Sequence, residues 1–150
     1  DYTIFTGQTL DEKNIAKMIN YKLKELDWDI ILPIFRPCIT TIKGFDSSIK
    51  NIYKKIFPDY NGIVWLNNND TDEYKYPVIG RKYYNKIGYV YNPLYNKKNF
   101  EKELIESSKF INKSRFVDDL LFKTLNMKSD DDNIYDLRKK FNFGLISLKK

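Results

Sequence analysis

The alternation of apolar and polar positions predicts a strand and then a helix at the start of the chain. Residues 2–6 alternate and include β-branched side chains, which is typical of a strand, and Gly7 ends the pattern. Apolar residues then recur at helical spacing over residues 10–26, which predicts an amphipathic helix. Thr9 and Glu12 occupy the N-cap and capping-box positions of this helix.

Two short, continuous apolar runs predict strands that are buried on both faces. They span residues 30–35 and 63–66, and such runs are typical of a parallel sheet. Pro33 lies inside the first run and indicates a bulge or a strand end, because proline cannot donate a ladder hydrogen bond. Between the two runs, helical spacing predicts a helix with Asp46 as its N-cap.

The second half of the chain continues the alternation between apolar pieces and helical spacing. The expected elements are a short apolar piece at 77–80, a short helix from Arg81, a strand at 88–91, a helix at 98–111, a strand or a helix at 116–122 and a helix at 132–141. Alternating strands and helices favour an α/β fold with a mostly parallel sheet flanked by helices. We expect a single domain over residues 1–150, and the start at Asp1 rather than Met is consistent with part of a longer chain.

Composition limits the chemistry that the chain can carry out. Its 150 residues are enough for one domain with a core, but they include no His and only one Cys, Cys38. A His-based triad, an imidazole proton shuttle, a disulfide and a Cys- or His-rich zinc site within the chain are therefore excluded. Any catalysis would have to use carboxylates, Lys, Arg, Tyr, hydroxyls or a metal held by oxygen ligands.

The net charge of +6 comes mainly from lysine. Lys, Asn and Ile have AT-rich codons, so this composition indicates an AT-rich genome, viral or otherwise, and weakens the case for nucleic-acid binding. No helix-turn-helix or RNA-recognition motif is present. Because no apolar run reaches the ~18 residues of a membrane span and these residues contain no signal-peptide h-region, we expect no membrane span. The sequence does not fix the location, but it favours an intracellular or virion-associated protein over a secreted one.

The loops that follow the two buried strands are the expected ligand sites of an open α/β sheet. Arg36 lies in the first loop and could pair with a phosphate through its planar guanidinium, or could be an arginine on a surface loop. Asp70 and Asp72 lie in the second loop and could supply oxygen ligands to a metal, or could be solvated. Asp118 and Asp119 could also bind a metal, or one of them could be exposed while the other caps or pairs.

Four segments, in order along the chain, resemble a viral and phage glycosyltransferase-like family with the GT-A (nucleotide-diphospho-sugar transferase) fold. The resemblance covers most of residues 10–140, although the chain begins after the family's first strand–helix–strand. The last segment is the most specific. The segments are Asp-Trp-Asp-Ile-Ile at 27–31, Lys-Gly-Phe-Asp at 43–46, Phe-Pro-Asp-Tyr-Asn-Gly-Ile-Val-Trp at 57–65 and the stretch from proline to tyrosine at 77–95.

The resemblance implies a nucleotide-sugar donor, a Mn²⁺ or Mg²⁺ ion on its diphosphate and a carboxylate base. The family's Ser-Asp-Asp metal motif falls on residues 35–37, where Arg36 and Pro37 replace the acids. Its Asn-Asp-Gly falls on residues 67–69, which are all Asn, and a late His falls near Thr124. Its base and acceptor region falls on residues 101–104, so that Glu101 and Glu103 are candidate catalytic groups, or else belong to a charged helix face.

We therefore predict a glycosyltransferase-like domain that lacks the metal-binding acids and is weakly active or inactive. The implied phosphate or nucleotide contacts are Arg36 and Arg81, and the candidate metal ligands are Asp70 and Asp72. Mn²⁺ or Mg²⁺ is expected only if the domain is active. The alternative is a non-catalytic structural or protein-interaction module, for example in a viral assembly, with a protein partner or a second copy. A third interpretation is polyanion binding through lysine, which would weaken steeply with salt.

Overall fold

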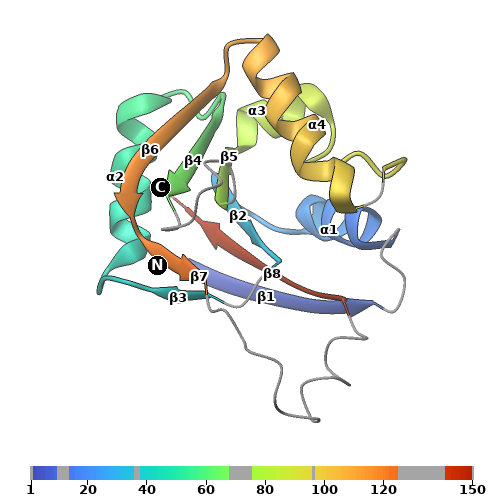
Figure 1. The fold of residues 1–150 in the computed structure, drawn as a ribbon, viewed down its shortest axis with the longest axis horizontal. Coiled ribbons are helices and arrows are strands. Elements are labelled where there is room, and N and C mark those ends of the chain that lie inside the picture. The colour runs from blue at the N-terminus through green and yellow to red at the C-terminus, as the bar shows by residue number, and fades with distance from the viewer. Residues whose placement is uncertain are drawn as a thin grey trace.

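The computed structural model describes residues 2–9, 14–35, 38–67, 76–95, 97–124 and 141–149. These residues form a six-stranded sheet with helices on both faces, and a small two-stranded sheet beside it (Figure 1). None of the described helices is long and apolar enough to cross a membrane. The strands are β1 (Tyr2–Thr9), β2 (Ile30–Ile34), β3 (Cys38–Thr40), β4 (Ile63–Asn67), β5 (Tyr76–Gly80), β6 (Ser114–Leu120), β7 (Phe122–Thr124) and β8 (Phe141–Leu148). The helices are α1 (Asn14–Glu25), α2 (Phe45–Ile56), α3 (Arg81–Ile87) and α4 (Lys97–Phe110).

The large sheet is mixed and mostly antiparallel, so the predicted mostly parallel, GT-A-like sheet is wrong. Its order is β1-β8-β2-β5-β4-β6, and among the described pairs only β4 and β6 run parallel. β5 returns antiparallel beside β4, and β8 inserts antiparallel between β1 and β2. The error has a physical reason. A continuous apolar run reports that a strand is covered on both faces, but it carries no information about the direction of its neighbours.

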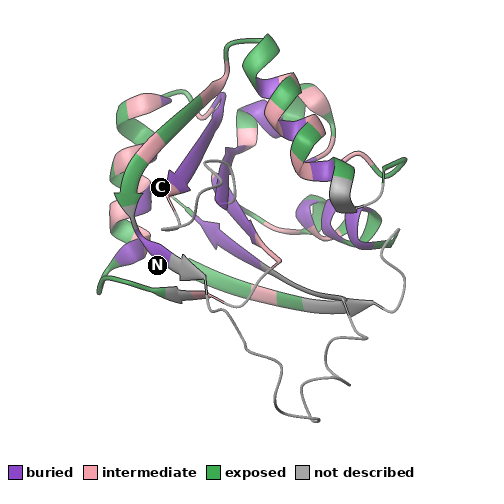
Figure 2. Cartoon of the chain, in the orientation of Figure 1, coloured by how far each residue is buried: buried purple, intermediate pink, exposed green. Residues whose placement is uncertain are grey.

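The two apolar runs supply side chains to two separate cores. Ile31 and Trp65 point to the face covered by α1, α3 and α4, whereas Ile30 and Val64 point to the face covered by α2. Successive side chains of a strand point to opposite faces, so a strand between two helical layers must be apolar at every position. Figure 2 shows these central strands as buried along most of their length.

Several predicted elements are confirmed within a few residues. The helix expected at 98–111 is α4, and the described part of the first helix is α1, within 10–26. The ambiguous segment at 116–122 is extended, in β6 and the start of β7. The second helix begins at Phe45, so Gly44 with its φ of 76° takes the N-cap position that was predicted for Asp46.

In the second half of the chain, the strand predicted at 88–91 and the last residue of the helix predicted at 132–141 differ from the structure. Residues 88–91 are not a strand: Gly88 has a φ of 86° and its N–H bonds to the carbonyl of Tyr84, which ends α3. Most of the helix expected at 132–141 lies outside the described residues. Phe141 itself begins β8, whose register with β1 joins the two ends of the chain.

The start of α3 lies in a tightly packed turn that we call the Gly80 junction, formed by Tyr53, residues 57–62 and Gly80–Arg81. A Cβ on Gly80 would lie 2.2 Å from both the Tyr53 hydroxyl and the Tyr60 carbonyl oxygen. That carbonyl accepts the N–H groups of Lys82 and Tyr83, at 3.1 and 3.2 Å, and so satisfies the first turn of α3. This cap accounts for the left-handed φ of 57° at Tyr60, which a bulky residue rarely adopts.

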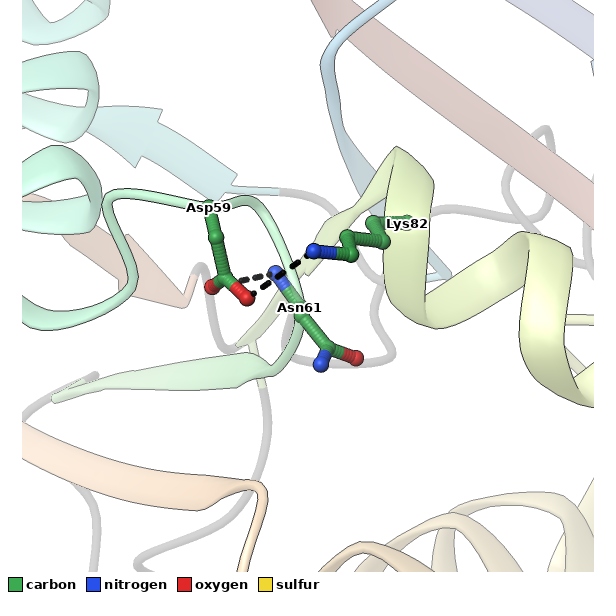
Figure 3. A network of polar contacts seen from close by, with 3 residues as sticks. All are labelled: Asp59, Asn61 and Lys82. Atoms are coloured by element: carbon green, nitrogen blue, oxygen red, sulfur yellow. Dashed lines mark hydrogen bonds and ion pairs between the residues drawn. The ribbon is translucent and has the colours of Figure 1, made fainter.

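An ion pair ties the same turn to α3 at the surface. The Lys82 Nζ lies 3.3 Å from Oδ2 of Asp59, and the Asn61 N–H donates to Oδ1 of Asp59 at 3.3 Å (Figure 3). Both side chains of the ion pair are about half exposed, so solvent screens the attraction. The buried contacts at Gly80, rather than this pair, therefore determine how the turn and the helix fit together.

Candidate functional site

Three of the predicted site residues, Arg36, Asp70 and Asp72, lie outside the described residues. The structure does describe the strand ends that precede them. Phe35, after β2, packs its ring against Tyr91 with the ring centroids 5.3 Å apart. Asn67, at the end of β4, donates through Nδ2 to the Asp118 carboxylate at 2.6 Å.

The described groups at this edge do not fit a divalent metal site. Asn67 directs its amide N–H at Asp118, so the pair forms a hydrogen bond rather than a set of oxygen ligands. Within the described ranges, no three Asp, Glu or Cys side chains lie close enough together to share an ion. Asp118 and Asp119 are both exposed on β6.

Helix α4 carries a carboxylate in an unusual environment. Glu103 is half-buried, and its Oε1 accepts a hydrogen bond from the Tyr89 hydroxyl at 3.1 Å. Its Oε2 is buried and has no hydrogen-bond partner among the described residues. Burial raises the pKa of Glu103, and the Tyr89 hydrogen bond offsets only part of this effect.

Tyrosines from α3 and the segment after it surround this carboxylate. The Tyr83 hydroxyl is buried, and burial together with the nearby Glu103 charge raises its pKa. Burial also raises the pKa of Tyr91, with a smaller effect from the half-buried Glu101, which lies two residues before Glu103 on α4. The structure thus brings both candidate bases, Glu101 and Glu103, next to the segment 77–95 that carries the most specific part of the resemblance.

The contacts of Arg81 are those of a side chain that holds neighbouring segments together. Its Nη1 donates to the Leu26 carbonyl at 3.1 Å, and its guanidinium lies 4.7 Å from the centroid of the Trp28 ring. Its backbone N–H bonds to the Asp29 carbonyl at 2.8 Å. These contacts join the segments 27–31 and 77–95. Phosphate binding by Arg81 stays a prediction.

Sequence reasoning missed the buried amide of Asn20. This side chain lies on the apolar face of α1, where its Oδ1 accepts the Val90 N–H at 2.9 Å and its Nδ2 donates to the Tyr91 carbonyl at 2.7 Å. It therefore holds in place the backbone that presents Tyr89 and Tyr91. The available signal was its helical spacing from buried Ala16 and Leu23, which places an amide where an apolar residue is usual.

Comparison with protein-family models, with curated proteins and with solved structures found no match for the chain. A functional assignment therefore depends on the chain's own residues and their geometry.

We predict that Glu103→Gln stabilises the protein at neutral pH. Because the pKa of Glu103 is raised in the folded state, ionisation disfavours folding, and the cost develops as pH rises from the ordinary glutamate pKa through the raised one. Glutamine keeps an acceptor for Tyr89 and does not ionise. Urea unfolding from pH 4 to pH 8 should give similar stability for both proteins at the acid end and a growing advantage for the variant above it.

The matched control is Glu106→Gln on the same helix. The Glu106 side chain is 68% exposed and pairs with Lys102. This substitution should leave the pH dependence nearly unchanged. If the Glu103→Gln curve runs parallel to that of the parent chain, the buried environment of Glu103 is wrongly described.

Proposed function

We propose that this chain is a glycosyltransferase-like domain, related to nucleotide-sugar-dependent transferases, with weak or no sugar transfer of its own. The observation that supports it most directly is the hydrogen bond between Tyr89 and Glu103. It joins the segment 77–95 to the helix position where the resemblance implies a base. The packing of segments 27–31, 57–65 and 77–95 around the start of α3 supports the same proposal.

Glu103 has one property of a general base for sugar transfer, a raised pKa, and because its Oε2 is buried the side chain would have to turn outward to reach a hydroxyl acceptor. A carboxylate with a raised pKa accepts a proton more readily, and general-base catalysis of this type typically contributes ~10²–10⁴-fold. The proposed role is that Glu103 takes the acceptor's proton while Tyr89 holds the carboxylate in position. Glu101, two residues earlier, projects from a different side of α4 and lies near Tyr91.

Weak activity is expected because of the leaving group, the diphosphate of the donor. A diphosphate leaving group develops negative charge, which a divalent cation with oxygen ligands would neutralise. Arg36 and Pro37 occupy the positions of the implied metal acids. A guanidinium supplies one positive charge but holds no metal, so departure of the diphosphate is expected to be slow.

The test is thermal unfolding with UDP- and GDP-sugars, each with and without Mn²⁺. At ~100 times Kd, a bound nucleotide sugar should stabilise the chain by about 2.7 kcal/mol. Mn²⁺ should add little, and release of the nucleotide should be slow or undetectable. Any residual transfer should be lost in Glu103→Gln and kept in Glu106→Gln, with nucleotide-sugar binding unchanged in both.

No stabilisation by any nucleotide sugar would contradict the proposal and favour a second candidate, an interaction module. The observation for it is an apolar group at the α4–β6 connection. Phe110 is 91% exposed, and Ile111 and Phe116 are also exposed. Since β6 is an edge of the described sheet, the occupant that fits is the β6 strand of a second copy. Light scattering over a concentration series would then show dimers, whereas a monomer throughout would exclude this candidate.

A further inference from the structure

A cavity of about 340 Å³ lies at the amino ends of β2 and β4, on the edge of the sheet opposite the loops that follow these strands. Its volume falls within the ~300–1,000 Å³ that small-molecule sites occupy. Charged and polar side chains from four separate segments line it. The full lining, with two apolar side chains included, is Asp29, Ile30, Lys50, Asn51, Lys54, Pro58, Tyr60 and Lys149.

The charge of the lining is positive. Lys50 and Lys54 lie one turn apart on α2, so they face the same side of the helix, and Lys149 follows β8. Among the described residues that line the cavity, Asp29 is the one carboxylate. Lys149 also pairs with Asp27, so α2 supplies most of the excess positive charge.

The neighbouring acid at Asp59 does not cancel this charge. It lies between Pro58 and Tyr60, but its two carboxylate oxygens accept from Lys82 and from the Asn61 N–H (Figure 3). Pairing with Lys82 lowers the pKa of Asp59 and directs its charge toward α3. The carboxylate of Asp59 is therefore engaged by Lys82 and Asn61, and the described lining carries Lys50, Lys54 and Lys149 against Asp29.

One part of the cavity wall, at Ile30, Pro58 and Tyr60, is largely apolar. Tyr60 stacks on Tyr53 with ring centroids 5.9 Å apart and an interplanar angle of 20°. The Tyr60 backbone is held by its cap on α3. Pro58 and Ile30 add apolar surface, and Asn51 adds an amide that can donate and accept. A ligand with an anionic end and a flat or apolar end matches this combination.

We propose that the cavity binds a small organic phosphate, with the phosphate at Lys50 and Lys54 and the organic part against Tyr60 and Pro58. Lysine ammonium groups bind phosphate as strong point charges, and a charge-assisted hydrogen bond is about twice as strong as a neutral one. The site is separate from Glu103 and from the loops after β2 and β4. It therefore does not depend on the proposed sugar-transfer function.

The test is isothermal titration of the full chain at low ionic strength with AMP, pyrophosphate, inorganic phosphate and malonate. AMP should bind more tightly than inorganic phosphate, because only AMP has an organic part to contact Tyr60. Malonate should bind more weakly than pyrophosphate. Lys54→Glu should weaken AMP binding by about tenfold or more.

Lys55→Glu is the matched control, because Lys55 is the next residue on α2, is exposed, and does not line the cavity. It changes the net charge by the same amount and should alter AMP affinity by no more than about twofold. Circular dichroism and thermal unfolding confirm that both variants fold. Absence of AMP binding, equal loss in the two variants, or malonate binding as tight as pyrophosphate would each overturn the proposal.

Discussion

Gly80→Ala is expected to cost about 3 kcal/mol or more of unfolding free energy, above the usual range for overpacking. The added methyl would lie 2.2 Å from the Tyr53 hydroxyl and 2.2 Å from the Tyr60 carbonyl oxygen. Neither group can withdraw easily. The Tyr53 hydroxyl donates to the Gly62 carbonyl at 2.6 Å, and the Tyr60 carbonyl caps α3. Relief of the clash would have to break one of these contacts.

Urea unfolding monitored by circular dichroism measures this effect. The control is Gly88→Ala, since Gly88 has a φ of 86° but no atom within 4 Å of the added Cβ. That change should cost only the left-handed backbone penalty of about 1–2 kcal/mol. A Gly80→Ala protein no less stable than the Gly88→Ala protein would show that the junction is not packed as described.

Trp28→Ala is expected to have the second large effect, a loss of about 3–5 kcal/mol of unfolding free energy. Trp28 is 2% exposed, and its ring makes an edge contact with Tyr84 at 5.4 Å between centroids. Its Nε1 donates to the Leu23 carbonyl at 3.1 Å, and the Arg81 guanidinium lies over its ring. The substitution therefore removes the contact between α1, α3 and the start of β2 in one step.

Differential scanning calorimetry and urea unfolding would both report this loss. Leu94→Ala is the control, because Leu94 is 88% exposed and its truncation should change stability by no more than about 0.5 kcal/mol. If Trp28→Ala unfolds at nearly the same urea concentration as the control, Trp28 does not join these elements.

The two proposals concern different parts of the molecule and can fail separately. The sugar-transfer proposal depends on Glu103 and Tyr89, between α4 and the segment after α3. The phosphate proposal depends on α2 and the turn at 57–62, on the other face of the sheet from α4. Glu103→Gln should leave AMP binding unchanged, and Lys54→Glu should leave the pH dependence of stability at Glu103 unchanged.

Local patterns in the sequence predicted which residues are buried and where α4 and most of α1 lie. The apolar spacing of Ile15, Ile19 and Leu23 depends only on the helical repeat, so it can be recognised without knowing the partner. The continuous runs in β2 and β4 likewise indicated strands covered on both faces. The prediction of a strand at 88–91 was wrong, because the apolar residues Val90 and Tyr91 are buried against α1 and α4 and do not belong to a sheet.

By itself, the sequence determined the apolar faces of α1, α2 and α4, many core positions and the exclusion of histidine chemistry, because these follow from side-chain type and short-range spacing. Only the tertiary structure decided the strand directions, the hydrogen bond of Glu103 to Tyr89 and the lysine-lined cavity. The Lys149–Asp27 pair at the rim of that cavity joins residues 122 positions apart. Such contacts depend on how the elements pack, and burial patterns along a chain are the same whether a neighbouring strand runs parallel or antiparallel.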